Sequence, residues 1–173
     1  MKRIVVYVLF IMLFVSNTFG FLENSRAVKA YRAGEFKEAL AQFESLLTQH
    51  PDDPELNYNA GKAAYKEQEY QAAVAYFSQA VKQSQLSDDF AVQAWFDLGN
   101  TYVKLKKWQE ALESYEQVLK YNNAHKEAKD MIEKIKKLLE EQQQQQQQQQ
   151  DNQQQDQDQQ SDQQQQDNNN QAQ

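Results

Sequence analysis

Residues 92–125 read VQAWFDLGNTYVKLKKWQEALESYEQVLKYNNAH, and this stretch decides the fold of the chain. Six of its residues carry the pattern: Trp95, Leu98, Gly99, Tyr102, Ala111 and Tyr115. Separations of three and four residues place side chains on one face of a helix. Small residues at Gly99 and Ala111 let two helices approach closely, and large residues fill the space around that contact. The stretch therefore predicts a pair of antiparallel helices.

The same pattern occurs twice more upstream. Alanines at equivalent positions are each followed four residues later by an aromatic residue: Ala39 and Phe43, Ala73 and Phe77, Ala111 and Tyr115. Ala39 and Ala73 are 34 residues apart, whereas Ala73 and Ala111 are 38 residues apart. We therefore expect a four-residue insertion near Ser87 to Phe90, between the second and the third unit.

The spacing W-x2-L-G-x2-Y is the signature of the tetratricopeptide repeat (TPR), a helix–turn–helix unit of about 34 residues. The chain resembles that family over three units, at about residues 21–53, 54–87 and 92–125. The first unit is the least regular, because Ala27 and Ala30 stand where Gly and Tyr are usual. Terminal repeats are commonly atypical. The resemblance predicts an all-α superhelical solenoid whose units bury their apolar faces against one another.

A further helix is expected after the third unit. Six apolar residues form one stripe: Ala128, Met131, Ile132, Ile135, Leu138 and Leu139. Lysines and acids cover the other faces, so residues 126–141 predict the capping helix that a solenoid needs. Helices are expected at residues 22–33, 36–48, 54–67, 70–84, 89–105, 108–121 and 124–140. The pairs Asp52–Asp53 and Asp88–Asp89 precede two of these helices and are expected to cap them.

Residues 1–20 have the layout of a secretory signal peptide. Lys2 and Arg3 form a positive region, and an apolar run of twelve residues, Ile4 to Val15, follows. We expect cleavage near Gly20, since this run is shorter than the about 20 residues that a membrane-spanning helix needs. A retained N-terminal anchor is the alternative. The chain contains no cysteine, which excludes the lipid-modified class of signal.

Residues 142–173 differ in kind from the rest of the chain. Residues 142–150 are nine consecutive glutamines, and the segment that follows is almost entirely Gln, Asn and Asp. No apolar residue larger than alanine is present, so nothing offsets the entropy that ordering would cost. We expect a disordered tail that acts as a tether or a weak interaction segment. A solubilising extension without a specific partner is the alternative.

The charge of the chain argues against nucleic acid as a partner. The formal net charge is −7, of which the tail supplies −5, and this leaves −2 on residues 1–141. The predicted solenoid therefore has neither a basic footprint for nucleic acid nor a polybasic patch for anionic lipid.

The sequence carries no signature of an enzyme. Catalysis needs convergent titratable groups or a bound cofactor. The two histidines, His50 and His125, are each expected at the end of the second helix of a unit. No metal-binding or nucleotide-binding motif occurs. We expect no catalytic activity, no cofactor and no metal ion.

The candidate binding site is the concave surface, which the first helix of each TPR unit lines. The repeat register places nine candidate partner-binding residues there: Tyr31, Arg32, Tyr58, Lys62, Tyr65, Lys66, Phe96, Asn100 and Lys104. Tyrosines offer rigid contact area, and the basic side chains can pair with carboxylates of a partner. The alternative is that these are ordinary residues of a helix surface.

The order of the segments carries a second resemblance. A signal-like start, three units, the insertion before FAVQAWFDLGNTYVKLKKWQEALESYEQVLKYN, the helix KEAKDMIEKIKKLLEE and the Gln/Asp tail together resemble the small TPR protein of the bacterial Bat (Bacteroides aerotolerance) system. The resemblance covers the whole chain. It implies a periplasmic or inner-membrane-associated adaptor for von Willebrand factor A-domain membrane proteins. A periplasmic TPR factor for cell-wall or outer-membrane assembly is the alternative, and it requires only the signal and the solenoid.

Overall fold

The computed structural model describes residues 24–82, 87–145 and 147–148. The predicted signal peptide, residues 1–20, lies outside the described residues, as do residues 149–173 of the predicted tail. The described residues therefore include most of the three repeat units and the helix after them.

The described residues form seven helices and no strand, which confirms the predicted all-α fold. They are a first helix at residues 24–32, α2 (Phe36–Leu47), α3 (Pro54–Lys66), α4 (Tyr70–Ala80), α5 (Asp88–Lys104), α6 (Trp108–Tyr121) and a last helix at residues 126–145. The α4 helix ends four residues earlier than expected. The last helix continues five residues beyond its expected end, because glutamine is a good helix former.

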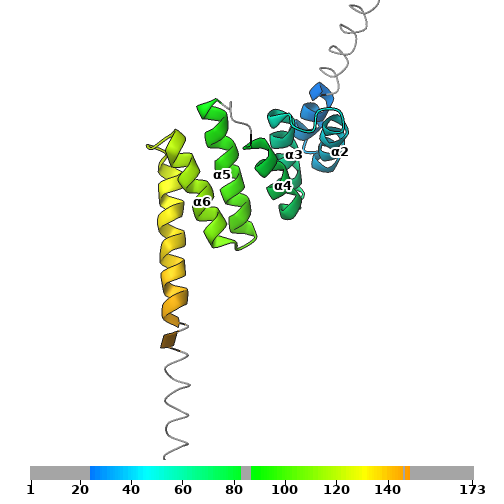
Figure 1. The fold of residues 1–173 in the computed structure, drawn as a ribbon. Coiled ribbons are helices and arrows are strands. Elements are labelled where there is room, and N and C mark those ends of the chain that lie inside the picture. Colours follow the sequence, from blue (N-terminus) through cyan, green and yellow to red (C-terminus); the bar gives the residue numbers. More distant parts are fainter. Residues whose placement is uncertain (1–23, 83–86, 146, 149–173) are drawn as a thin grey trace, which may run out of the picture. The chain divides into compact units, whose positions relative to one another are not determined.

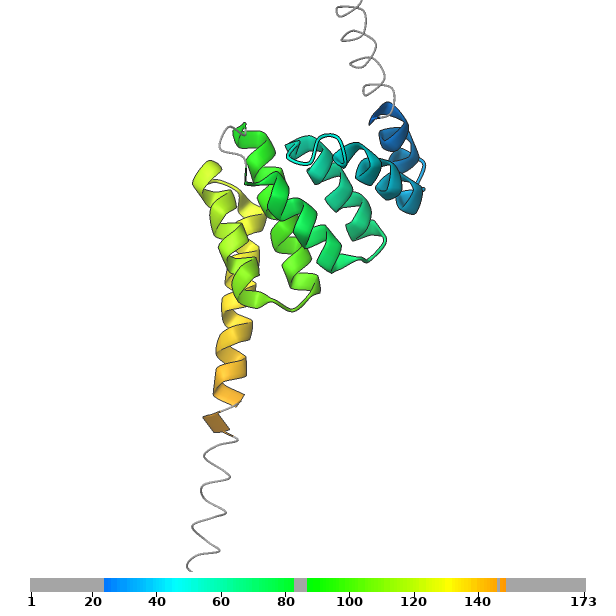
Figure 2. The same cartoon turned by 45° about the vertical axis from the view of Figure 1, so that its right-hand side comes forward.

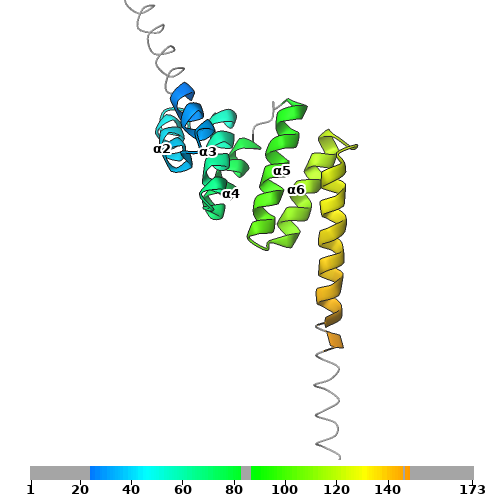
Figure 3. The same cartoon turned by 180° about the vertical axis from the view of Figure 1, so that it is seen from behind.

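The helices pack in pairs along the chain. The α3 and α4 helices pack against each other, and so do α5 and α6, while α2 packs on α3 and α4 on α5 (Figures 1 and 2). Figure 3 shows the same order from behind. Ala27 and Ala30 of the first helix, Phe43 of α2 and Leu98 of α5 belong to one buried apolar cluster. One core therefore runs through all three units.

In units two and three, a large ring of the second helix lies against a glycine of the first helix. Ala39, Ala73 and Ala111 have no exposed surface, as their predicted packing role requires. A Cβ atom added to Gly61 would lie 2.7 Å from the Phe77 ring. A Cβ atom added to Gly99 would lie 2.8 Å from the Tyr115 ring. With contacts this close, a side chain at either glycine would force the facing ring to move, so the two glycines set how near the paired helices lie.

The insertion is an extra first turn of α5. The α5 helix has 17 residues, whereas its counterpart α3 has 13. Four residues are about one turn of an α-helix. This agrees with the position expected from the repeat spacing. Phe90 lies in the added turn, and its ring makes an edge contact with Tyr58 of α3, at 5.3 Å between centroids.

Three helices begin with a cap at the same place in the repeat. The Leu56 N–H donates to Asp53 Oδ1 at 3.0 Å, and the Phe90 N–H donates to Ser87 Oγ at 3.4 Å. The expected cap at Asp53 is therefore confirmed. The expectation for Asp88–Asp89 was wrong, because Ser87 caps α5 and the two acids lie in its first turn. Carboxylates in a first turn still stabilise a helix through its dipole.

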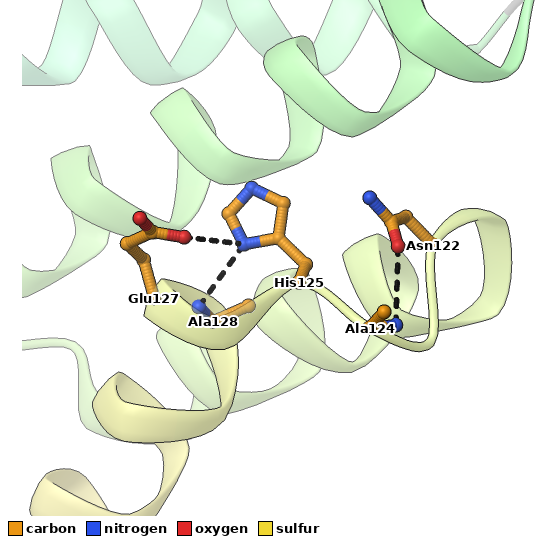
Figure 4. A network of polar contacts seen from close by, with 5 residues as sticks. All are labelled: Asn122, Ala124, His125, Glu127 and Ala128. Atoms are coloured by element: carbon orange, nitrogen blue, oxygen red, sulfur yellow. Dashed lines mark hydrogen bonds and ion pairs between the residues drawn. The ribbon is translucent and has the colours of Figure 1, made fainter.

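His125 fills the third capping position, in front of the last helix (Figure 4). The Ala128 N–H donates to His125 Nδ1 at 3.2 Å, and the Ala124 N–H donates to Asn122 Oδ1 at 3.1 Å in the preceding turn. Nδ1 also lies 3.5 Å from Glu127 Oε2. The prediction that His125 ends a helix was wrong, because α6 ends at Tyr121 and His125 caps the start of the next helix.

The last helix has the predicted apolar stripe. Ala128 and Ile135 are buried, and the other four stripe residues are half-buried: Met131, Ile132, Leu138 and Leu139. All its lysines and acids up to residue 141 are exposed. The chain divides into two compact parts between Met131 and Ile132, inside this helix, so the repeat units belong to the first part. None of the helices in the described ranges has the length and apolar character to cross a membrane.

The substitution Gly99→Ala tests the close packing of unit three. Replacing a helix-interior glycine by alanine normally gains about 1 kcal/mol of helix propensity. Here the added methyl group meets Tyr115, and overpacking costs about 1–3 kcal/mol. We expect a net loss on the order of 1 kcal/mol in urea unfolding. The control Gln93→Ala, on the exposed side of the same helix, should change stability by less than about 0.5 kcal/mol; an increase in stability for Gly99→Ala would contradict the packing.

The substitution His125→Ala tests the cap of the last helix. Loss of a capping side chain typically costs about 1 kcal/mol. The variant His125→Ser also removes the imidazole ring but restores a short acceptor, as Ser87 provides in front of α5. We expect thermal unfolding to rank the Ser variant above the Ala variant. Equal stability of the two variants would show that His125 acts through its ring contacts and not as a cap.

Candidate functional site

An open pocket with a cavity volume of about 200 Å³ lies among the first helices of the three units. We call it the central pocket. Seven residues line it: Tyr31, Lys62, Tyr65, Lys66, Phe77, Asp97 and Asn100. Five of them are among the nine residues that the repeat register predicted for partner binding. The register gathers them because equivalent positions of successive units face the same side of the array, as Tyr31 and Tyr65 or Lys62 and Asn100 illustrate.

Aromatic faces hold the two lysines of the pocket. The Lys62 Nζ atom lies 5.3 Å from the centre of the Tyr31 ring and 5.2 Å from that of Tyr58. The Lys66 Nζ atom lies 6.0 Å from the Phe36 ring. Such cation–π contacts contribute about 0.5–1 kcal/mol each at exposed sites. Within the described part of the chain, neither ammonium group forms an ion pair.

A chain of hydrogen bonds holds Asp97 at the pocket. The Tyr58 hydroxyl donates to Asp97 Oδ2 at 2.8 Å. The Asn100 side chain also donates to this carboxylate. The Asn100 side chain is itself held in place, because the Tyr115 hydroxyl donates a hydrogen bond to its Oδ1 atom at 2.7 Å. Asp97 is thus connected to the ring that packs against Gly99.

Opposing effects act on the ionisation of these groups. Burial raises the pKa of the Asp97 carboxyl, whereas the Tyr58 hydroxyl, the charges of the two lysines and Asn100 lower it; the net shift is upward. Burial and the charge of Asp97 raise the pKa of Tyr58. Tyr58 therefore remains a hydrogen-bond donor throughout the physiological pH range.

The other four predicted residues lie outside the pocket lining. Tyr58 lies next to it and contacts both Lys62 and Asp97. Arg32 and Lys104 are exposed. They occupy the positions of units one and three that are equivalent to Lys66 in unit two.

Phe96 makes its ring contacts with residues outside the lining of the central pocket. Its ring centroid lies 5.5 Å from that of Tyr115 and 5.0 Å from that of His125. Consecutive helix residues are rotated by about 100°, so Phe96 packs toward α6 while its neighbour Asp97 faces α3. The structure therefore gives Phe96 a packing contact that the repeat register did not predict.

Asp97 is the site residue that the sequence interpretation missed. A signal was available, because Asp97 is the only charged residue in the fourteen-residue stretch FAVQAWFDLGNTYV, residues 90–103. A carboxylate on such an apolar helix is rarely buried unless it is paired. Its hydroxyl partner, Tyr58, is 39 residues away in the sequence. No local pattern identifies that partner.

A second pocket, of about 300 Å³, lies between α4, α5 and α6. Its lining includes Trp95, Leu98 and Tyr102, whose places in the repeat pattern are packing positions. The central pocket is the stronger candidate site because it draws charged and aromatic side chains from three units. Over the described ranges, we find no group of three or more His, Asp or Glu side chains that could hold a metal ion.

Comparisons with known proteins agree with the repeat pattern. Two family models described as tetratricopeptide repeat match residues 25–88 and 92–125. A search of curated protein sequences gives no match.

Solved structures share the fold at low sequence identity. The first TPR of Spaghetti (RPAP3), bound to the HSP90 peptide SRMEEVD, is 22% identical over 69% of this chain and 92% of its own, with a TM-score of 0.62. The Sgt2 TPR domain from Aspergillus fumigatus is 20% identical over 70% and 80%, with a TM-score of 0.60. The Yersinia enterocolitica secretion chaperone SycD, in complex with a YopD peptide, is 17% identical over 66% and 89%, with a TM-score of 0.57.

The substitution Asp97→Asn tests the environment of the carboxylate through its pH dependence. A carboxyl group whose pKa is raised by folding favours the folded state at low pH, and that contribution is lost as the pH rises from its unfolded pKa through its folded pKa. The amide does not titrate. We therefore expect the stability of Asp97→Asn, relative to the parent, to increase between pH 3 and pH 7. Urea unfolding at both pH values measures the difference, and a relative decrease would contradict a net upward shift.

Proposed function

Because this chain belongs to the tetratricopeptide repeat proteins, we propose that it is a non-catalytic adaptor that holds a segment of a partner protein in the central pocket. Repeats of this family generally serve as protein–protein interaction modules. The main observation behind this proposal is that three units meet at one solvent-open pocket whose two lysines form no ion pair within the described part of the chain.

The composition of the pocket supports a peptide-like occupant. Tyr31 and Tyr65 offer rigid aromatic surface, and Asn100 and Lys62 offer polar groups beside it. Tyrosine is one of the residue types that dominate the binding energy at protein interfaces. Two of the structurally similar proteins, RPAP3 and SycD, have been solved with bound peptides. Their example supports the same mode of binding here.

We further propose that the adaptor works at the periplasmic face of the inner membrane, in an assembly resembling the Bat system. The support is the order of segments in the sequence: a predicted signal peptide or anchor at residues 1–20, the repeat units, the last helix and the Gln-rich tail. Von Willebrand factor A-domain membrane proteins are the partners that this resemblance suggests. The alternative is a periplasmic factor for cell-wall or outer-membrane assembly.

Co-purification from the native membrane tests the proposal. A tagged full chain should recover A-domain proteins reproducibly. The double variant Lys62→Glu/Lys66→Glu reverses the charge of the pocket, and we expect it to recover at least about tenfold less of the same proteins, because close like charges oppose binding. The matched control is Lys37→Glu/Lys129→Glu, which makes the same charge change at two exposed lysines outside the pocket lining.

Three outcomes are informative. Loss of partners in the pocket variant but not in the control supports the pocket as the binding site. Equal recovery by the parent and the pocket variant would rule the pocket out. Recovery of cell-wall synthases in place of A-domain proteins would favour the alternative assignment.

A further inference from the structure

We infer that the central pocket selects a partner segment that presents one carboxylate to Lys62 and Lys66, and that Asp97 disfavours a second one. This inference rests on the proposed function, because it assumes that the pocket is the binding site. It adds the chemical class of the occupant: a linear protein segment with a single acidic group among neutral residues.

The net charge of the central pocket is opposite in sign to the net charge of the surrounding domain. Residues 24–141 contain 16 Lys and Arg but 19 Asp and Glu, so the domain is acidic. Among the residues that line the pocket, Lys62, Lys66 and Asp97 are the charged ones, and they sum to one positive charge. A positive pocket on an acidic domain concentrates anionic groups at one place and repels them elsewhere.

The lysines are positioned to receive an anion. Lys62 is half-buried, and its ammonium group lies between two tyrosine faces. The side chain therefore loses little further freedom when it binds, and this freedom is a principal cost of pairing a lysine. Because neither lysine is paired with a carboxylate of the described chain, an incoming carboxylate does not have to displace one.

Asp97 limits the number of acids that the pocket accepts. Its carboxylate already receives hydrogen bonds from Tyr58 and Asn100, so it stays in the pocket as a fixed negative group. One partner carboxylate brings the sum of charges to zero. A second one would leave an unbalanced negative charge in a site from which the partner has removed water, where repulsion is least screened.

The added turn of α5 contributes to this arrangement. Tyr58 orients Asp97, and the ring of Phe90 packs on the ring of Tyr58. Phe90 belongs to the turn that the shorter α3 lacks. The four-residue insertion thus supports Tyr58, which holds the Asp97 carboxylate in place.

A charge series of peptides tests the inference on the full chain. A phage library of random dodecamers is first selected on the parent protein, and clones that fail to bind Lys62→Glu/Lys66→Glu are kept as pocket binders. One such peptide is then synthesised in amidated form with no, one or two adjacent carboxylates. We expect fluorescence anisotropy to show binding about tenfold tighter with one carboxylate than with none, and weaker binding with two than with one.

The variant Asp97→Asn should change the order of affinity for the peptides with no, one and two carboxylates. With Asp97 uncharged, the lining carries two positive charges, so the two-carboxylate peptide should bind at least as tightly as the one-carboxylate peptide. Far-UV circular dichroism confirms that the variant is folded. The control variant Lys37→Glu should bind the three peptides in the same order of affinity as the parent protein. A further peptide carries its one carboxylate as a free C-terminus in place of the acidic side chain. If it binds with equal affinity, a terminal carboxylate is identified as the source of the charge.

Two failures can be told apart. If selection yields no peptide whose binding depends on Lys62 and Lys66, the proposed function fails. If pocket-dependent peptides bind equally well with no, one or two carboxylates, or if Asp97→Asn leaves their order unchanged, the inference about selectivity is wrong while the pocket remains a binding site.

Discussion

The structure depends on one recurring contact, in which a large ring lies against a glycine sixteen residues earlier in the same unit: Phe77 against Gly61 and Tyr115 against Gly99. This contact sets the distance between the paired helices and buries the rings. It also reaches the candidate site. The Tyr115 ring that packs on Gly99 ends in the hydroxyl that fixes Asn100, and Asn100 in turn donates to Asp97. Scaffold and pocket are therefore not independent, because a change in helix packing would move the polar groups of the pocket.

The pocket itself arises where the units differ from one another. A regular repeat would place similar residues at each equivalent position, as Arg32, Lys66 and Lys104 illustrate. Asp97 has no such counterpart: the equivalent residue of unit two is Asn59. The added turn of α5 is also specific to unit three, and it brings Phe90 onto Tyr58. The repeat supplies a surface that is generic to its family, and these departures give that surface its own chemistry.

Much of the fold could be predicted because its causes are local in the sequence. The 3.6-residue period located the helices, and the small residues at Gly61, Gly99 and the repeated alanines located their contacts. The site could be predicted only in part. Whether Phe96 or Asp97 faces the pocket depends on a rotation of one residue, which the period does not resolve. The caps at Ser87 and His125 depend on where each helix begins, and helix ends are the least certain feature of a sequence pattern.

Site-specific photo-crosslinking in the native cell envelope tests the central claim most directly. A benzophenone amino acid placed at Tyr65 lies in the lining of the central pocket, whereas the same group at Tyr121 lies on an exposed side chain of α6 outside that lining. We expect a discrete crosslinked partner polypeptide from Tyr65 and none from Tyr121. Crosslinks of equal yield and identity from both positions, or from Tyr121 alone, would contradict the central pocket as the place where this protein holds its partner.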